Sequence, residues 1–339
     1  MTETLRARQA VPAPVSGVRA LLKSPWGAFA LRRLGGLVLS LALLILLTFL
    51  IVPLIPGDPA IAILGPGATA DSIAIMREKL HLDVPLWEQF GIYLQGLGSL
   101  DLGTSFRYST PVLTTIFTKL PYTATIAFGS IAVVLIVAIP LGMAIGVVTR
   151  GGRRPVVGTV FGAVAGFLAS FPAYVAATLL VLVFAIWLKV LPPGGAGGPA
   201  TFVLPIAALA LGPTFAVARV VRQETFGVLQ QDYMRTARGR RISRARLYMR
   251  HALPNLMAST LTLTGLILSG LLGGAIIIET VFSLPGLGLE VIQAIIYRDF
   301  PVIRGIILTI GVIAIFINLL IDIVLGLIDP RTLGASTHD

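Results

Sequence analysis

The sequence predicts an all-α polytopic membrane protein with six transmembrane helices and a small external subdomain after the first helix. Of its 339 residues, 56% are hydrophobic and only 12% are charged, and the mean hydropathy is +0.92. Soluble domains carry about 25% charged residues. Several apolar stretches reach the roughly 20 residues that a helix needs to cross a bilayer. None of these stretches alternates with the period of two that a membrane β-barrel requires.

The charges predict which side of the membrane each loop faces. Basic residues gather before residue 34, at 150–154, and between Arg219 and Arg250. Because cytoplasmic loops are enriched in lysine and arginine, we expect these segments and both termini in the cytoplasm. The acidic stretch 53–119 is then external. The basic cytoplasmic loops account for the net charge of +11. Because no nucleic-acid recognition module accompanies this charge, we expect no nucleic-acid partner.

Missing residue types restrict the chemistry of the chain. It contains no cysteine, which excludes disulfides, thiolate nucleophiles and cysteine metal sites. Its three histidines, His81, His251 and His338, lie far apart and lack the spacing of a metal site. We therefore expect no catalytic residue, cofactor or metal in this chain.

The N-terminal third is predicted to hold a tail, one span and an external region. Residues 1–31 contain scattered arginines without a sustained apolar face, which predicts a cytoplasmic tail. The first span, at 34–55, is too long for the apolar region of a signal peptide and should remain as an anchor. Helical segments are expected near 72–82 and 85–97 in the polar region that follows. The first span and the polar region together make one predicted unit, residues 32–121. The external part of this unit is too small to fold alone.

The remaining five spans form the predicted transmembrane core, residues 122–331, which is followed by a cytoplasmic tail at 332–339. The third span is long enough to tilt or break, and Pro172 should kink it because proline removes a helix hydrogen bond. The glycine- and proline-rich turn at 191–199 cannot be helical. The five spans are expected at 122–148, 156–187, 202–221, 256–278 and 301–327.

The cytoplasmic loop at 222–254, between the fourth and fifth spans, carries the most informative pattern. A helical run is expected over 226–238, with a break near Gly239 and with Ser243 as the N-cap of a second short helix. A simple basic connector explains the arginines of this loop. It does not explain the helix, the break, the second helix and the Leu-Pro pair at 253–254.

The spacing of this loop resembles the EAA loop of the membrane subunits of bacterial ABC importers. Arg235 stands at the first motif position, and Arg241 occupies the position where the family has glycine. We expect the turn that this glycine permits to move to Gly239. In the family, the loop forms a short helix that docks in a groove on a separate ATPase, and we expect Ala237 to lie at this docking surface. The resemblance implies the following docking and coupling residues: Arg235, Thr236, Ala237, Arg238, Gly239, Arg241, Ser243, His251, Leu253 and Pro254.

Further motifs narrow the resemblance to the first permease subunit of dipeptide and oligopeptide ABC importers. Each motif is weak alone, because Pro-Gly pairs usually mark turns, but their order around six spans is specific. They are PGDP at 56–59, LDVPL at 82–86 with Tyr93 and Leu94, DLGTS at 101–105, ETVFSLPGLG at 279–288, and residues 318–331.

This resemblance implies a type I ABC importer permease fold in the bacterial inner membrane and a set of partner proteins. The expected partners are a homologous second permease, two cytoplasmic ATPase subunits that bind ATP and magnesium, an extracytoplasmic peptide-binding protein, and membrane lipid. The chain has no Gly-Lys-Ser/Thr phosphate-binding loop of its own. The exact cargo and the residues of the substrate path stay open.

Two other function classes remain as alternatives. A self-contained carrier or channel usually needs ionisable groups at mid-membrane, and none lies within 122–148, 156–187, 202–217 or 256–278. Arg304 and Asp322 of the last span are expected to be structural. A membrane-embedded hydrolase would need a carboxylate pair, but Asp101, Glu279, Glu290 and Asp299 are expected to be separated on an exposed face. Close helix packing and a wall of the transport path are expected instead from Gly265, Gly270, Gly273, Gly274 and Phe282.

Overall fold

The computed structural model describes residues 25–54, 58–65, 67–240 and 242–328. Within these residues the secondary structure is helical, apart from one isolated bridge between Thr104 and Pro111. The predicted all-α class is therefore confirmed. The expectations for residues 1–24, for Arg241 and for the tail at 332–339 lie outside the described residues.

Five helices are long and apolar enough to cross a membrane. Three of them differ clearly from the predicted bounds: one begins nine residues earlier, at Pro25, one begins ten residues earlier, at Val112, and one continues to Gln230 instead of ending near Val221. Their polar ends extend beyond the apolar stretches by which spans are recognised in a sequence. The five helices are α2 (Pro25–Leu54), α6 (Val112–Val148), α9 (Val203–Gln230), α12 (Leu253–Val281) and α14 (Phe300–Ile328).

The third predicted span is broken. It consists of α7 (Pro155–Ala169), α8 (Ala173–Leu180) and a π-helical turn, η2 (Val181–Trp187), and the two halves are bent by 93°. Pro172 lies at the break with extended backbone angles (φ −62°, ψ 130°). The predicted kink is confirmed, and the bent pair counted as one span gives the expected six. The turn that follows is non-helical up to Gly198, where the short 3-10 helix η3 (Pro199–Phe202) begins.

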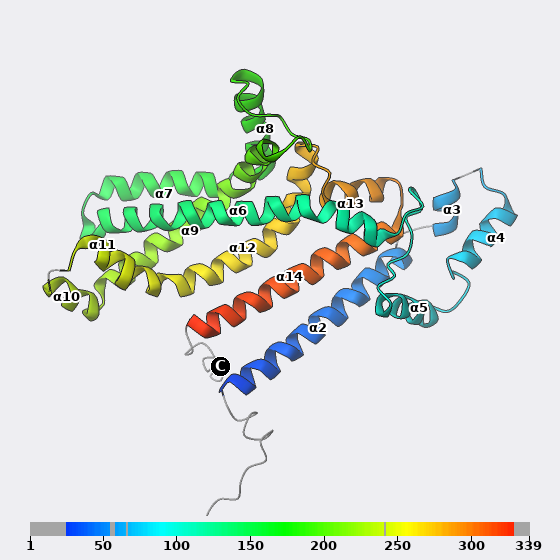
Figure 1. The fold of residues 1–339 in the computed structure, drawn as a ribbon, viewed down its shortest axis with the longest axis horizontal. Coiled ribbons are helices and arrows are strands. Elements are labelled where there is room, and N and C mark those ends of the chain that lie inside the picture. The colour runs from blue at the N-terminus through cyan, green and yellow to red at the C-terminus, as the bar shows by residue number, and fades with distance from the viewer. Residues whose placement is uncertain (1–24, 55–57, 66, 241, 329–339) are drawn as a thin grey trace, which may run out of the picture.

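Short helices follow the first span, and another precedes the last. α3 (Pro59–Leu64), α4 (Ala70–Lys79) and α5 (Leu86–Gly98) follow the first span, and the last two correspond to the predicted helical segments. α13 (Leu287–Ile296) was not predicted, because its apolar run is too short for a span and begins within a Leu-Pro-Gly-Leu-Gly sequence that indicates a turn. Figure 1 shows α3, α4 and α5 at one end of the molecule and α10 (Asp232–Gly239) and α11 (Arg244–Arg246) at the other.

The core lies between α6 and α9, which pack closely along their lengths because two positions of α6 are glycine. A Cβ atom at Gly142 would lie 2.5 Å from the carbonyl oxygen of Ala218, and one at Gly146 would lie 2.8 Å from Cβ of Thr225. Larger residues would force the helices apart. On the other side of the bundle α14 packs against α2, and Asp322 pairs with Arg33 at 2.7 Å. The expected structural role of Asp322 is thus confirmed.

Of the five small or aromatic residues predicted to give close packing, three do so within this chain. A Cβ atom at Gly265 would meet Ile321 at 2.5 Å, one at Gly274 would meet Leu209 at 3.2 Å, and Phe282 is buried. Gly270 and Gly273 have no atom within 4 Å of such a Cβ. These two glycines are exposed on the open face of α12, so for them close packing stays a prediction that concerns a partner helix.

Candidate functional site

The predicted coupling loop folds into two short helical segments between α9 and α12. α9 ends at Gln230, and α10 (Asp232–Gly239) follows after Gln231, whose backbone is extended (φ −62°, ψ 148°). The predicted continuous run over 226–238 is therefore wrong, because the chain turns at Gln231. The break near Gly239 is confirmed, since α10 ends there. α11 (Arg244–Arg246) and a π-helical turn, η4 (Leu247–Ala252), then lead directly into α12.

α10 is fixed to the end of α9 by its inner face. Met234 is fully buried and Ala237 is 7% exposed, and both belong to the main hydrophobic core. Their spacing of three residues puts both side chains on one side of the helix. Arg238 adds a polar anchor, because its guanidinium donates a hydrogen bond to the carbonyl oxygen of Leu229 in the last turn of α9. Burial, and secondarily the charge of Arg150, lower the pKa of Arg238.

The outer face of α10 is exposed, basic and partly aromatic. The side chain of Arg235 is 77% exposed and Tyr233 is 42% exposed, and Thr236, Gly239 and Arg240 are exposed beside them. Arg235 lies 3.8 Å from Asp232 across the first turn, and both side chains are largely in solvent. A pair of this kind contributes little to stability. Both groups are therefore available to a partner.

This geometry corrects the expected position of Ala237. The residue is buried against this chain's own core and does not lie on an exposed docking surface. Ala237 lies on the side of α10 that packs on the core, so it holds α10 in place. Arg241 is outside the described residues.

The second half of the loop is also held by its inner face. Leu247 and Ala252 are buried, while Met249 and Arg250 are exposed. Ser243 stands at the N-cap position of α11, but its side chain makes no capping hydrogen bond, so this detail of the prediction is wrong. The remaining predicted residues lie at the start of α12 or just before it: His251 and Leu253 are half-buried, and Pro254 is exposed.

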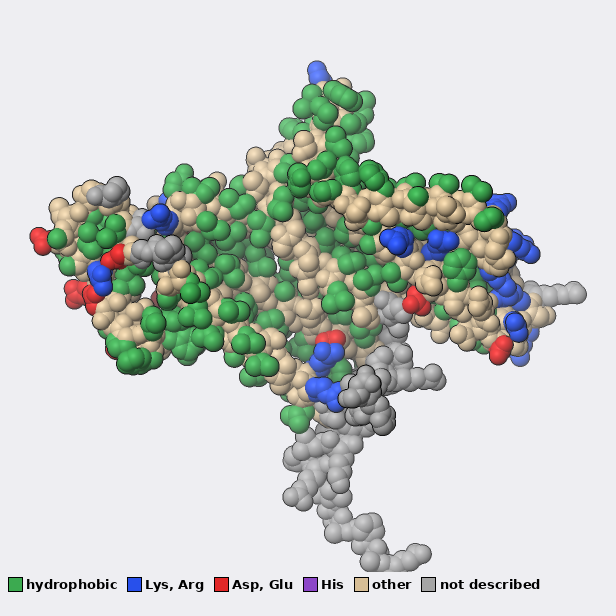
Figure 2. Space-filling model, turned by 180° about the vertical axis from the view of Figure 1, so that it is seen from behind, with side chains coloured by type: hydrophobic (Ala, Val, Ile, Leu, Met, Phe, Trp, Pro, Cys, Tyr) green, Lys and Arg blue, Asp and Glu red, His purple; other side chains and the backbone are tan. Residues whose placement is uncertain are grey.

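We call the exposed face formed by Gln231–Arg240 and by Arg244–Arg250 the coupling surface. It lies at one end of the molecule, and Figure 2 shows lysine and arginine side chains gathered at this end. α9 ends at this surface, and η4 continues directly into α12. The described residues of the predicted site thus lie together at this end of the molecule. Some of them, such as Ala237, pack on the core instead of facing solvent.

At the opposite end, the four carboxylates that a hydrolase would need have structural partners instead. Glu279 is fully buried and accepts hydrogen bonds from the Thr123 hydroxyl at 2.6 Å and from the backbone amides of Gly288 at 2.6 Å and Leu289 at 3.1 Å. Glu290 pairs with Lys119 at 3.0 Å. The expectation of an exposed face was wrong for Glu279, Glu290 and Asp299, which are all buried.

Asp299 and Asp101 organise the segment that precedes α6. Asp299 accepts from the Ser105 hydroxyl at 2.5 Å and from the amides of Phe106 and Arg107, which ties the DLGTS motif to the start of α14. Asp101 accepts from the amide of Gly103 at 2.8 Å in a local turn. Each of the four carboxylates thus binds a turn, a helix start or a lysine. Among the described residues, no group of three histidine or acidic side chains is placed to hold a metal ion.

The other motifs after the first span likewise fix the external helices. Asp58 caps α3 through the amide of Ala60 at 2.9 Å. Arg77 joins Asp58 at 2.8 Å and Asp83 at 2.9 Å, and these carboxylates raise the pKa of Arg77. The PGDP and LDVPL motifs are therefore linked to each other through α4.

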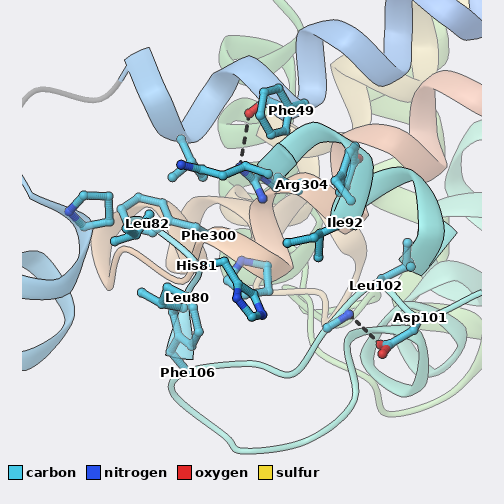
Figure 3. A pocket seen from close by; sticks show the side chains of 17 residues that line it. Phe49, Leu80, His81, Leu82, Ile92, Asp101, Leu102, Phe106, Phe300 and Arg304 are labelled. Atoms are coloured by element: carbon cyan, nitrogen blue, oxygen red, sulfur yellow. Dashed lines mark hydrogen bonds between the residues drawn. The ribbon is translucent and has the colours of Figure 1, made fainter. Parts of the chain in front are cut away.

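A hollow of about 280 Å³ lies between α2, α5 and the start of α14 (Figure 3). Arg304 donates a hydrogen bond to the carbonyl oxygen of Phe49 at 3.2 Å. Its guanidinium carbon also lies 5.5 Å and 5.4 Å from the ring centres of Phe49 and Tyr93, within cation–π range. Arg304 therefore holds the external helices on the spans, in agreement with its predicted structural role.

Two family models match the sequence in successive parts. Residues 27–127 match the N-terminal part of membrane components of binding-protein-dependent transport systems, and residues 138–334 match the binding-protein-dependent transport system inner membrane component. The second match alone covers more than half of the chain. The chain belongs to this permease family.

Curated relatives match almost the whole permease. It is 37% identical over 312 residues to a putative peptide transport system permease protein of Brucella abortus, with 90% of this chain and 98% of the relative covered. It is also 37% identical over 302 residues to the glutathione transport system permease protein GsiC of Salmonella choleraesuis, with 89% and 97% covered.

A solved structure agrees with the fold of the permease. An inward-facing crystal form of the MetNI methionine ABC transporter matches with a TM-score of 0.54 and 16% identity, over 64% of this chain and 97% of that chain. Sequence and fold together show that the permease is a multi-pass membrane subunit of an ABC importer and that its family is not enzymatic.

Proposed function

We propose that the permease moves short peptides inward while two cytoplasmic ATPase subunits, one of them docked at the coupling surface of this chain, bind and hydrolyse ATP with magnesium. The observation that carries the proposal is α10, whose inner face is locked to α9 and whose outer face is basic and exposed. A short helix of this kind fits the helix-in-groove mode of recognition. In this arrangement the coupling surface and both termini face the cytoplasm of the bacterial inner membrane.

Rigid attachment makes the coupling surface a mechanical link. Met234, Ala237 and Arg238 tie α10 to α9, and η4 continues into α12. Closure of the ATPases around ATP therefore moves both spans. The ATPases drive the change because they contact the inward-facing and outward-facing states differently.

The open face of α12 supports a second, homologous permease as a partner. Leu266 and Ile277 are exposed on this face, and between them Gly270 and Gly273 leave the backbone open. Small residues at this spacing allow another helix to approach closely in a membrane. The peptide passes between the two permeases.

Peptide cargo is supported by the names of the relatives, which include peptide and glutathione permeases. Glutathione is itself a tripeptide, so main-chain amide groups are common to both cargoes. An extracytoplasmic binding protein delivers the peptide to the end of the molecule that carries α3, α4 and α5.

Transport in liposomes tests the proposal. The permease, its second permease and both ATPases are reconstituted, the binding protein is supplied outside, and uptake of a labelled dipeptide is measured with competition by glutathione or a longer peptide. We expect uptake that requires ATP and every subunit. Uptake without the ATPases would show a carrier or channel, and peptide cleavage by the isolated chain would show a hydrolase.

A further inference from the structure

A cleft of about 750 Å³ opens between the turn that joins α6 to α7 and the second half of the coupling loop. Arg150, Arg153 and Arg154 line it from the turn, and Arg238 and Arg244 line it from the loop. Two segments that are more than eighty residues apart in the sequence thus share one basic hollow. The docking of an ATPase on the outer face of α10 does not by itself account for it.

The charge of this cleft is not balanced by the chain. No aspartate or glutamate lines it. Within the described part of the chain, the ion pairs that are formed involve other basic residues, namely Arg33, Arg77, Lys119 and Arg235. Five like charges around one hollow repel one another, and a bound anion relieves this repulsion.

The apolar part of the cleft points to an anion with a hydrocarbon tail. Val147 and Val148 line it from the last turn of α6, where this span ends. α7 begins directly after the turn, at Pro155, and presents an exposed apolar row along its length: Val156, Val160, Val164 and Phe167. A free phosphate or a protein carboxylate uses the arginines only, whereas a phospholipid uses both the arginines and this row.

We propose that the cleft binds the phosphate headgroup of an anionic phospholipid from the membrane leaflet on the side of the coupling surface. The acyl chains lie along the exposed row of α7, and the headgroup phosphate lies among the five arginines. Basic pockets between spans on the cytoplasmic side are known to hold anionic headgroups. The lipid joins the α6–α7 turn to the coupling loop and so stiffens the support of the coupling surface.

The full-length chain in detergent is titrated with short-chain phosphatidylglycerol and, separately, phosphatidylcholine, and bound lipid is counted by native mass spectrometry. We expect phosphatidylglycerol to bind more tightly. The variant R150Q/R153Q/R154Q removes three of the five arginines that surround the headgroup and should bind it about a hundredfold more weakly. The control R240Q/R246Q/R250Q removes the same charge from exposed arginines outside the cleft and should bind like the unmodified chain.

Three results would overturn the proposal. If the unmodified chain bound the two lipids equally, the proposal would fail whatever the variants did. Displacement of phosphatidylglycerol by inorganic phosphate would identify a site for a soluble anion. Normal lipid binding by the cleft variant, together with loss of the ATPase on co-purification, would assign the cleft to the ATPase contact.

Discussion

Glu279 shows how a single buried residue organises the end of the molecule opposite the coupling surface. Its carboxylate lies at the end of α12 and receives the first amides of α13, where a helix N-terminus favours negative charge. Gly286 and Gly288 make this contact possible, since a Cβ atom at either would lie 2.3 Å from Cδ of Glu279 or from Cα of Ile276. The ETVFSLPGLG motif is thus a structural unit.

Thr123 connects this unit to α6 and gives a direct test. Its hydroxyl donates to Glu279 and accepts from the amide of Leu287 at 2.9 Å. Thr123→Val keeps the shape but removes both bonds, and leaving such buried groups unpaired costs about 1–3 kcal/mol. We expect a lower midpoint of unfolding by SDS in mixed micelles. Thr123→Ser, which retains the hydroxyl, should lose much less, and equal losses would show that the hydroxyl is unimportant.

Residue-level predictions from the sequence succeeded for a charged side chain near a span end and failed for the details of the short helices in the loop. Asp322 was expected to pair and does so with Arg33. Ala237 was expected at a surface, because a motif position gives no information about which side of a short helix faces the core. Ser243 has the right position for a cap without the hydrogen bond.

Among the elements, the broken third span was predictable and the break before α10 was not. Pro172 marks the first break directly in the sequence. At Gln231 neither proline nor glycine is present, and the turn arises because Met234 and Ala237 pack back on the core. α13 was missed for a related reason, since a short apolar helix that is buried by its neighbours resembles a loop with a few hydrophobic residues.

The packing of α10 predicts opposite effects at two adjacent positions. Ala237→Asp places a charge in the core contact with α9, where an unpaired buried charge costs several kcal/mol. We expect α10 to detach, trypsin to cut faster after Arg235 and Arg238, and the ATPase to be lost on purification. Thr236→Asp introduces the same charge on the exposed side of the helix. Its trypsin protection should stay unchanged, and equal sensitivity of both variants would refute the inner-face account.

At the scale of the whole molecule, basic and acidic side chains are separated along the long axis. Basic side chains gather at the end that carries the coupling surface, and the acidic side chains of α4 and α5 lie at the other (Figures 1 and 2). The start of α2 and the end of α14 are joined by Arg33 and Asp322. The order of the spans and the sign of the charge at each end were predictable, because apolar stretches mark the spans and the charged residues lie in the segments between them.

This axis predicts the topology in cells. The chain has no cysteine, so single cysteines at Asp71 on α4 and at Arg240 after α10 report on one site each. In intact cells an impermeant thiol reagent should label the first and spare the second. Both should be labelled after permeabilisation, which shows that the second is accessible. Labelling of position 240 alone in intact cells would invert the topology.

The docking of an ATPase on the outer face of α10 is tested most directly by photo-crosslinking in the assembled importer. A photoreactive residue replaces Tyr233, which is 42% exposed on α10, or Trp87, which is exposed on α5 at the opposite end. We expect position 233 to form an adduct with the ATPase subunit and position 87 to form none. An importer that transports peptide normally but gives no ATPase adduct at 233 would contradict the proposed coupling surface.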